Sequence, residues 1–221
     1  MENELGIPSK DLLDAIYVAE SRKIHRNFSN EKDITGPGGQ YFIRFRTSKM
    51  YLYILEKGKE VGLTNPTSEW TQEDIDLVNT RLDNDIVDEY VLDFYLNVYF
   101  KGSILLRIPK ASRLAFAIIY LNSRLLANKA IQQAMLSMQK SNIYNFKGIS
   151  LSKVDGKIGS KTKDTVDILT LEHDKGLKHH FETMFLSKSK SQYIILWSKN
   201  KEDFSRYLLG WNNRVERYED M

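Results

Sequence analysis

The strongest constraint on the fold is the apolar segment that runs from Ala111 to Met138. Its apolar residues recur densely, in a pattern typical of a buried helix or of a pair of buried helices. The longest uncharged apolar run inside it, Leu114 to Leu121, has only eight residues. Because a membrane-spanning helix needs about 20 such residues, the segment predicts the core of a helical protein and no membrane span.

The composition agrees with a folded chain. Of its 221 residues, 42% are hydrophobic and 11% are aromatic, which is more than disordered chains contain. A chain of this length can bury roughly 70% of its unfolded surface. Cysteine is absent, so disulfides, thiolate zinc sites, iron–sulfur clusters and cysteine nucleophiles are excluded.

Helical spacing of apolar residues recurs along most of the chain. Ser9 and Thr71 are expected as helix N-caps, and Gln40 to Arg46 alternates as a short strand does. Asn27 to Gly39, which is rich in turn residues, predicts a loop. Further helices are expected at Ser9 to Lys23, Ser48 to Lys59, 72 to Asp83, Asp85 to Phe100, Lys161 to Leu171, Leu177 to Trp197 and Glu202 to Tyr218.

Charge is unevenly distributed. Residues 72–93 hold eight acids and one base, whereas residues 94–154 hold nine bases and no acid. One interpretation is a cationic face for a polyanion such as nucleic acid or cell wall. The alternative, which we favour, is that the acidic helix pairs with the basic segment inside one domain, so nucleic acid is not an expected partner.

The most informative motif is a tight turn at Asp155-Gly156-Lys157-Ile158-Gly159, followed by Thr162 near a helix start. Upstream lies the phrase Ile131-Gln132-Gln133-Ala134-Met135. In this order the two resemble the signature of peptidoglycan-binding modules. Near the end of the chain, Gly210-Trp211-Asn212-Asn213-Arg214 resembles the closing motif of the glycoside hydrolase family 108 muramidases.

The resemblance to this family implies a mainly α fold. A lysozyme-like helical domain (residues 1–140), with a small loop or strand element near residues 36–46, would precede a helical peptidoglycan-binding-like segment (residues 141–221). In the family, the first helix ends in a catalytic Glu followed by two glycines. Here the resemblance places Glu20 at that position, and Ser21 and Arg22 replace the glycines.

The resemblance also implies the other members of the site. Lysozyme-type cleavage needs a general acid held neutral in an apolar or crowded site, and a second group that acts on the opposite face of the sugar. Glu20 is the expected acid, and Asp33 and Glu31 are the candidates for the second carboxylate. Gly38, Gly39, Gln40 and Asn122 are expected to bind substrate. A simpler interpretation of Glu20 is an exposed helix-end acid paired with Lys23.

Two functions remain open. The first is a phage- or prophage-encoded muramidase that cuts the β-1,4 bonds of peptidoglycan glycan strands, without cofactor or metal. The second is a catalytically silent lysozyme-like subunit of a phage tail, baseplate or secretion assembly, in which Arg22, Tyr41 or Arg44 fills the cleft.

The N-terminus lacks the basic and apolar regions of a signal peptide. We therefore expect synthesis in the bacterial cytoplasm, then action in the periplasm or cell wall after release, or within a virion. The expected partners are glycan strands, with phage structural proteins or a secretion apparatus as further candidates.

Overall fold

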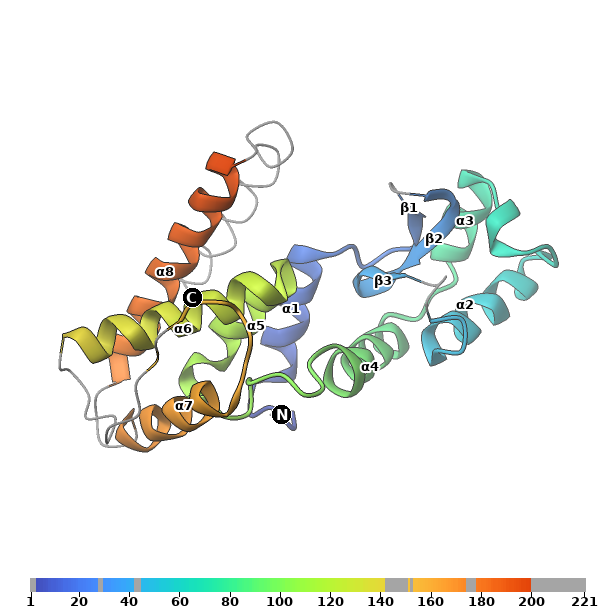
Figure 1. The fold of residues 1–221 in the computed structure, drawn as a ribbon. Coiled ribbons are helices and arrows are strands. Elements are labelled where there is room, and N and C mark those ends of the chain that lie inside the picture. Colours follow the sequence, from blue (N-terminus) through green and yellow to red (C-terminus); the bar gives the residue numbers. More distant parts are fainter. Residues whose placement is uncertain are drawn as a thin grey trace. The chain divides into compact units, whose positions relative to one another are not determined.

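Most of the described chain is helical, as the apolar spacing predicts (Figure 1). The computed structural model describes residues 3–27, 30–41, 45–141, 151, 153–173 and 178–199. The chain divides into a central unit, residues 13–101, and a terminal unit, residues 1–12 and 102–221. Helix α1 (Ser9–Ala19) carries the chain from the terminal to the central unit. The domain boundary expected after residue 140 lies inside the terminal unit.

The central unit contains a small antiparallel sheet of order β1-β2-β3, with strands His25–Asn27, Asn30–Gly36 and Gln40–Tyr41. A short 3-10 turn, η1 (Pro37–Gly39), joins β2 to β3. The short strand expected from Gln40 is confirmed over two residues. The loop expected from Asn27 to Gly39 is wrong for most of its length, because β2 and η1 occupy this segment.

Tertiary contacts explain why these polar residues form strands. Strand β1 packs against α3 (Gln72–Asn79), and β2 packs against η2 (Thr67–Glu69). Ile24 lies just before β1. The Asn79 side chain accepts a hydrogen bond from the Ile24 N–H at 2.9 Å and donates one to the Ile24 carbonyl at 3.0 Å. These partners lie more than thirty residues away in sequence, so local spacing does not reveal them.

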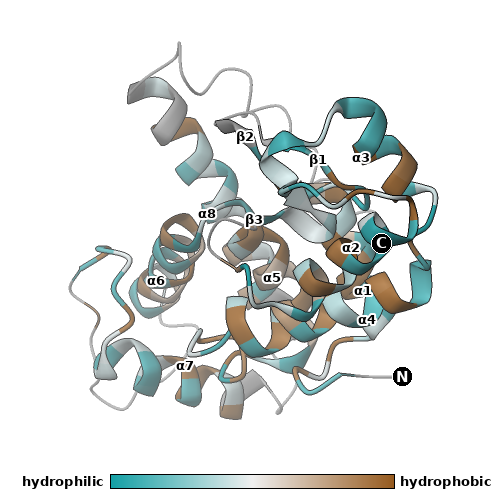
Figure 2. Cartoon of the chain, turned by 90° about the vertical axis from the view of Figure 1, so that its right-hand side faces the viewer, coloured by the Kyte–Doolittle hydropathy of each residue, from teal (hydrophilic) through white to brown (hydrophobic). Residues whose placement is uncertain are grey.

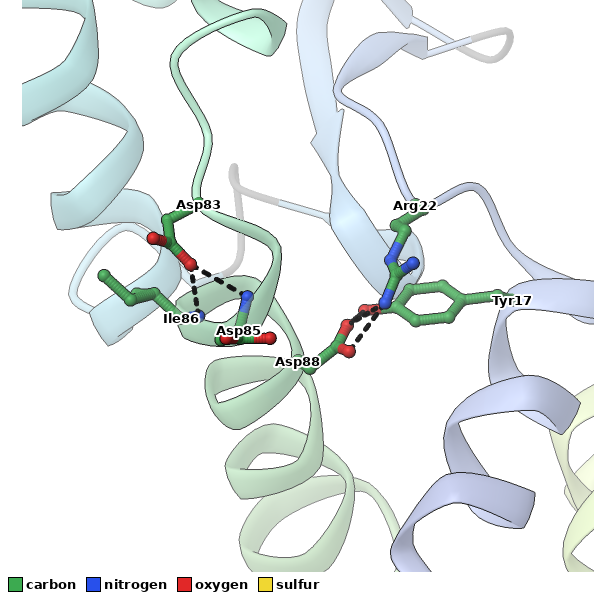
Figure 3. A network of polar contacts seen from close by, with 6 residues as sticks. All are labelled: Tyr17, Arg22, Asp83, Asp85, Ile86 and Asp88. Carbon is green, nitrogen blue, oxygen red and sulfur yellow. Dashed lines mark hydrogen bonds and ion pairs between the residues drawn. The ribbon is translucent and has the colours of Figure 1, made fainter.

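Two further helices complete the central unit, α2 (Lys49–Glu60) and α4 (Asn84–Phe94). The expected N-cap Thr71 is confirmed: its hydroxyl accepts from the Asp74 N–H, and the Asp74 carboxylate accepts from the Thr71 N–H. Asp83 caps α4, and its carboxylate accepts from two N–H groups of the first turn (Figure 3). Trp70, 1% exposed, is the largest buried side chain of this core.

Helix α4 does not continue unchanged to Phe100. It passes at Tyr95 into a π-helical turn, η3 (Tyr95–Tyr99). Such turns are rare and occur frequently at functional sites.

The terminal unit is built around α5 (Arg113–Asn122), which follows the 3-10 turn η4 (Lys110–Ser112). Every residue of α5 from Ala115 to Leu121 is buried. The longest apolar run of the sequence therefore lies in the core of this unit. Helix α6 (Arg124–Lys140) packs against α5, α7 (Ser160–His173) and α8 (Lys178–Lys199). Figure 2 shows both hydrophilic and hydrophobic residues along this helix.

Aromatic rings join α5 to α8. Phe116 and Phe185 are stacked with ring centroids 5.8 Å apart, and Phe181 stacks on Phe185 in turn. All three are almost fully buried.

The two phrases of the predicted peptidoglycan-binding signature come together in the terminal unit. The Gln132 side chain accepts from the Gly156 N–H at 2.8 Å and donates to the Lys157 carbonyl at 3.0 Å. The Asp155 carboxylate also accepts from Gln132, at 3.2 Å. The buried glutamine therefore supplies hydrogen-bond partners to the backbone of the turn. This explains why the two sequence phrases occur together.

In the described part of the chain, no helix combines the length and apolar character that a membrane span requires. The expected helix from Glu202 and the Gly210-Trp211 motif lie outside the described residues.

Candidate active site

The carboxyl end of α1 places Glu20 beside the glycines of η1. Glu20 follows the last residue of the helix, and its N–H still donates to the Ile16 carbonyl at 2.7 Å. A Cβ built on Gly39 would lie 2.6 Å from both Cδ and Oε2 of Glu20. The half-buried carboxyl group thus occupies space that only a glycine at position 39 leaves open.

Both glycines have the backbone conformation that the turn demands. Gly38 and Gly39 have φ of +66° and +70°, in the region that favours glycine. A Cβ on Gly38 would meet the two Val91 methyl groups at 3.0 and 3.1 Å. Glu20, Gly38 and Gly39 are therefore brought together, although they are nineteen residues apart in sequence.

Gln40 follows this turn and carries an unusual side chain. It pairs with Gly36 in the sheet and is 1% exposed. Neither its amide nitrogen nor its amide oxygen has a hydrogen-bond partner among the described residues. A buried amide without partners is energetically costly, so it stands out as a candidate for ligand binding.

The candidates for the second carboxylate lie on β2. Asp33 is 8% exposed, and its Oδ1 accepts from the Ile34 N–H at 2.9 Å. Because side chains alternate along a strand, Asp33 shares a face with Thr35, whereas Gly36 and its partner Gln40 lie on the other face. Glu31 belongs to the same strand, but its side chain lies outside the described residues.

Asn122 lies in the terminal unit, at the end of α5. Its side-chain amide donates to the Tyr193 hydroxyl of α8 at 3.0 Å. Tyr193 is fully buried, so this contact joins two helices of the terminal unit. Asn122 therefore belongs to a different unit from Glu20 and the glycine turn.

Arg22 is one of the residues expected to fill the cleft if the protein is a catalytically silent lysozyme-like subunit. In the structure its side chain contacts α4. Its Nη2 donates to both carboxylate oxygens of Asp88, at 2.7 and 2.6 Å. The Tyr17 hydroxyl donates to the same carboxylate at 2.7 Å, and the guanidinium lies 4.8 Å from the Tyr17 ring centroid (Figure 3). The side chain of Tyr41 and all of Arg44 lie outside the described residues.

Two groups in this contact have a raised pKa. Burial and then the hydrogen bond to Asp88 raise the pKa of the Tyr17 phenol above its ordinary value. The same carboxylate raises the pKa of the Arg22 guanidinium. The phenol therefore stays a hydrogen-bond donor throughout the neutral range.

Sequence reasoning missed the residues of α4 that contact this region. It assigned the acids of residues 72–93 to pairing with the basic segment after them, yet Asp88 pairs with Arg22 and Asp93 pairs with Lys49, 3.4 Å away. It also assigned no role to Tyr95, whose hydroxyl donates to the Gly38 carbonyl at 2.8 Å. The three- and four-residue spacing of Asp88, Val91 and Tyr95 is the signal that could have marked a common helix face.

Among the described residues, no three His, Asp or Glu side chains gather in a way that could hold a metal ion. Comparison of the chain with protein-family models, with curated proteins and with solved structures found no match.

Proposed function

We propose that the chain is a peptidoglycan hydrolase that cleaves the β-1,4 glycosidic bond after N-acetylmuramic acid, with Glu20 as the general acid. The observation that carries the proposal is the contact of the Glu20 carboxyl group with Gly39. A glycosidase acid must be partly withdrawn from water so that it keeps its proton near neutral pH. A half-buried carboxyl group at a helix end, against a turn without side chains, meets this requirement.

The glycine turn also suits a polysaccharide ligand. Gly38 is buried and its open side is filled by the Val91 methyl groups, so in this proposal a sugar ring approaches the turn at Gly39, beside the Glu20 carboxyl group. In this proposal Gln40 supplies an amide that matches the donor and acceptor of an N-acetyl group. Because Gln40 is 1% exposed, glycan binding must open access to its side chain.

The first experiment is wall hydrolysis by the purified full chain, with Glu20→Gln as the test variant. Asp14→Asn, at an exposed position of the same helix, is the matched control. We expect wild type and Asp14→Asn to release soluble fragments whose new reducing ends are muramic acid, and Glu20→Gln to release none. Release that persists in Glu20→Gln would refute the role of Glu20, while the hydrolase itself would stand.

Gln40→Leu tests the ligand role of the buried amide. Removing an unpaired buried amide should raise the free energy of unfolding by about 1 kcal/mol. If Gln40 binds the glycan, the same variant should show a higher KM. If the variant is more stable and its KM is unchanged, Gln40 does not bind the glycan.

The burial of Asp33 favours a second candidate, a catalytically silent lysozyme-like subunit of a phage tail, baseplate or secretion assembly. A carboxylate that is 8% exposed, and bonded to its neighbouring N–H, is poorly placed to act on a sugar. This candidate predicts well-folded protein that releases no fragments from the walls of several bacterial types.

A further inference from the structure

We propose that Asp88 and Tyr95 are positioning residues, which hold the two chain segments that set the place of the Glu20 carboxyl group. The relevance of this inference to catalysis rests on the proposed function; the positioning itself does not. Asp88, Val91 and Tyr95 are three and four residues apart, so they follow one face of α4 and the start of η3. Each contacts a segment adjacent to Glu20 or to Gly39.

The first segment is the exit of the chain from α1. Tyr17 lies three residues before Glu20, and Arg22 lies two residues after it. Both donate to the Asp88 carboxylate over 2.6–2.7 Å, and they also contact each other through the guanidinium and the ring (Figure 3). The backbone that carries Glu20 is thus fixed to α4 on either side of it.

The second segment is the glycine turn. The Gly38 N–H donates to the Ser21 carbonyl at 2.8 Å, and the Gly38 carbonyl accepts from the Tyr95 hydroxyl at 2.8 Å in a buried site. The Val91 methyl groups pack where a side chain at position 38 would be. The turn is therefore held between the α1 exit and α4.

The two segments close a ring of contacts beside Glu20. From Asp88 the ring passes through Arg22, the Ser21 carbonyl and Gly38 to Tyr95, the residue that follows α4. A general acid must be held within a few tenths of an ångström of its productive place, so supporting residues of this kind decide whether the acid works. Tyr95, the last member of this ring of contacts, is also the first residue of the π-helical turn η3. Such turns are rare and occur frequently at functional sites.

The test uses the amide of Gly39 as a reporter, because the Glu20 carboxyl group lies against this residue. In the isotope-labelled full chain, the Gly39 amide chemical shift is followed against pH by NMR. Glu20→Gln identifies the part of the shift that comes from the Glu20 titration. The variants are Asp88→Asn and Tyr95→Phe, which keep side-chain size, and the control is Glu89→Gln at an exposed neighbouring position of α4.

We expect the titration amplitude at Gly39 to fall by at least about half in both test variants and to stay unchanged in the control, since a charge effect weakens as the distance grows. Wall hydrolysis should show kcat about tenfold lower in the test variants with little change in KM. A purely structural role would instead lower Tm and leave the Gly39 amplitude intact.

The outcomes separate this inference from the proposed function. A reduced amplitude in a protein that cleaves no wall would support positioning and refute the hydrolase. An unchanged amplitude in both folded variants would overturn positioning, whether or not the wild-type protein cleaves walls.

Discussion

At the residue scale, the contact between Glu20 and Gly39 depends on the absence of one side chain. Two separate effects act at position 39: the positive φ, which strains any other residue, and the space that the Glu20 carboxyl group occupies. Gly62 separates these effects, because its φ is +88° and a Cβ there would meet nothing within 4 Å.

We predict that Gly39→Ala and Gly62→Ala lower the free energy of unfolding by a similar amount, about 1–2 kcal/mol each, because both are strained at positive φ. The flexible Glu20 side chain can move away from the new methyl group at little cost. Only Gly39→Ala should then lose wall hydrolysis, because only there does the acid leave its place. Urea unfolding and fragment release measure the two effects, and equal hydrolysis by both variants would contradict the prediction.

Asp155 gives a pH-dependent prediction at the same scale. The Lys157 N–H, and then the Gln132 amide, hold the pKa of the Asp155 carboxyl below its ordinary value of 3.8. A carboxyl whose pKa is lower in the folded state stabilises the fold above its unfolded pKa, and this contribution disappears as the pH falls through the folded pKa. The stability difference between wild type and Asp155→Asn should therefore be complete near neutral pH and shrink below about pH 4. Urea unfolding at pH 7 and pH 3 measures it, and a difference that grows on acidification would contradict the sign.

At the element scale, helices and turns are stabilised by side chains that satisfy backbone groups. Gln132 does this for the turn at Asp155-Gly156, and Asn79 does it for the chain before β1. Such residues are buried and polar, and losing one leaves several backbone groups unpaired.

Gln132→Leu should lower the free energy of unfolding by about 2–3 kcal/mol, because the Gly156 N–H and the Lys157 carbonyl lose their partner. Gln133→Leu on the same helix is the control. Its amide oxygen accepts one hydrogen bond from Gln192, so its loss should cost only about 1 kcal/mol. Chemical unfolding of both variants provides the measurement. Equal losses would mean that the turn does not depend on Gln132.

At the scale of the whole molecule, the central and terminal units each bury aromatic side chains of their own. Trp70 is 1% exposed in the central unit and Phe185 is 0% exposed in the terminal unit. Residues 13–101 are continuous, whereas the terminal unit combines both ends of the chain. Local stability can therefore differ between the units.

Trp70→Ala should remove about 3–5 kcal/mol from the central unit, and Phe185→Ala a similar amount from the terminal unit. In hydrogen exchange, Trp70→Ala should lower protection in α2, α3 and α4 more than in α6. Phe185→Ala should show the reverse pattern. Equal loss of protection in both units for either variant would mean that the chain unfolds as one cooperative body.

The sequence by itself determined the elements whose signals are local. The apolar spacing predicted α2, α7 and α8 to within a few residues, and the Thr71 N-cap marked the start of α3. Spacing within one helix reports directly on which residues can be buried, so these predictions needed no tertiary information. The sequence also singled out Glu20 and the glycines as a pair of features, through a resemblance that stays a prediction.

Only the tertiary structure decided what surrounds Glu20. Strand β2 is mostly polar; it pairs with the neighbouring strands β1 and β3, and η2, more than thirty residues later, packs against it. The contacts of Asp88 and Tyr95 with Arg22 and Gly38 span more than fifty residues. No local sequence pattern at Asp88 or Tyr95 predicts its partner. Hydrogen bonds between distant segments depend on how the chain folds, and not on the spacing of residues along the sequence.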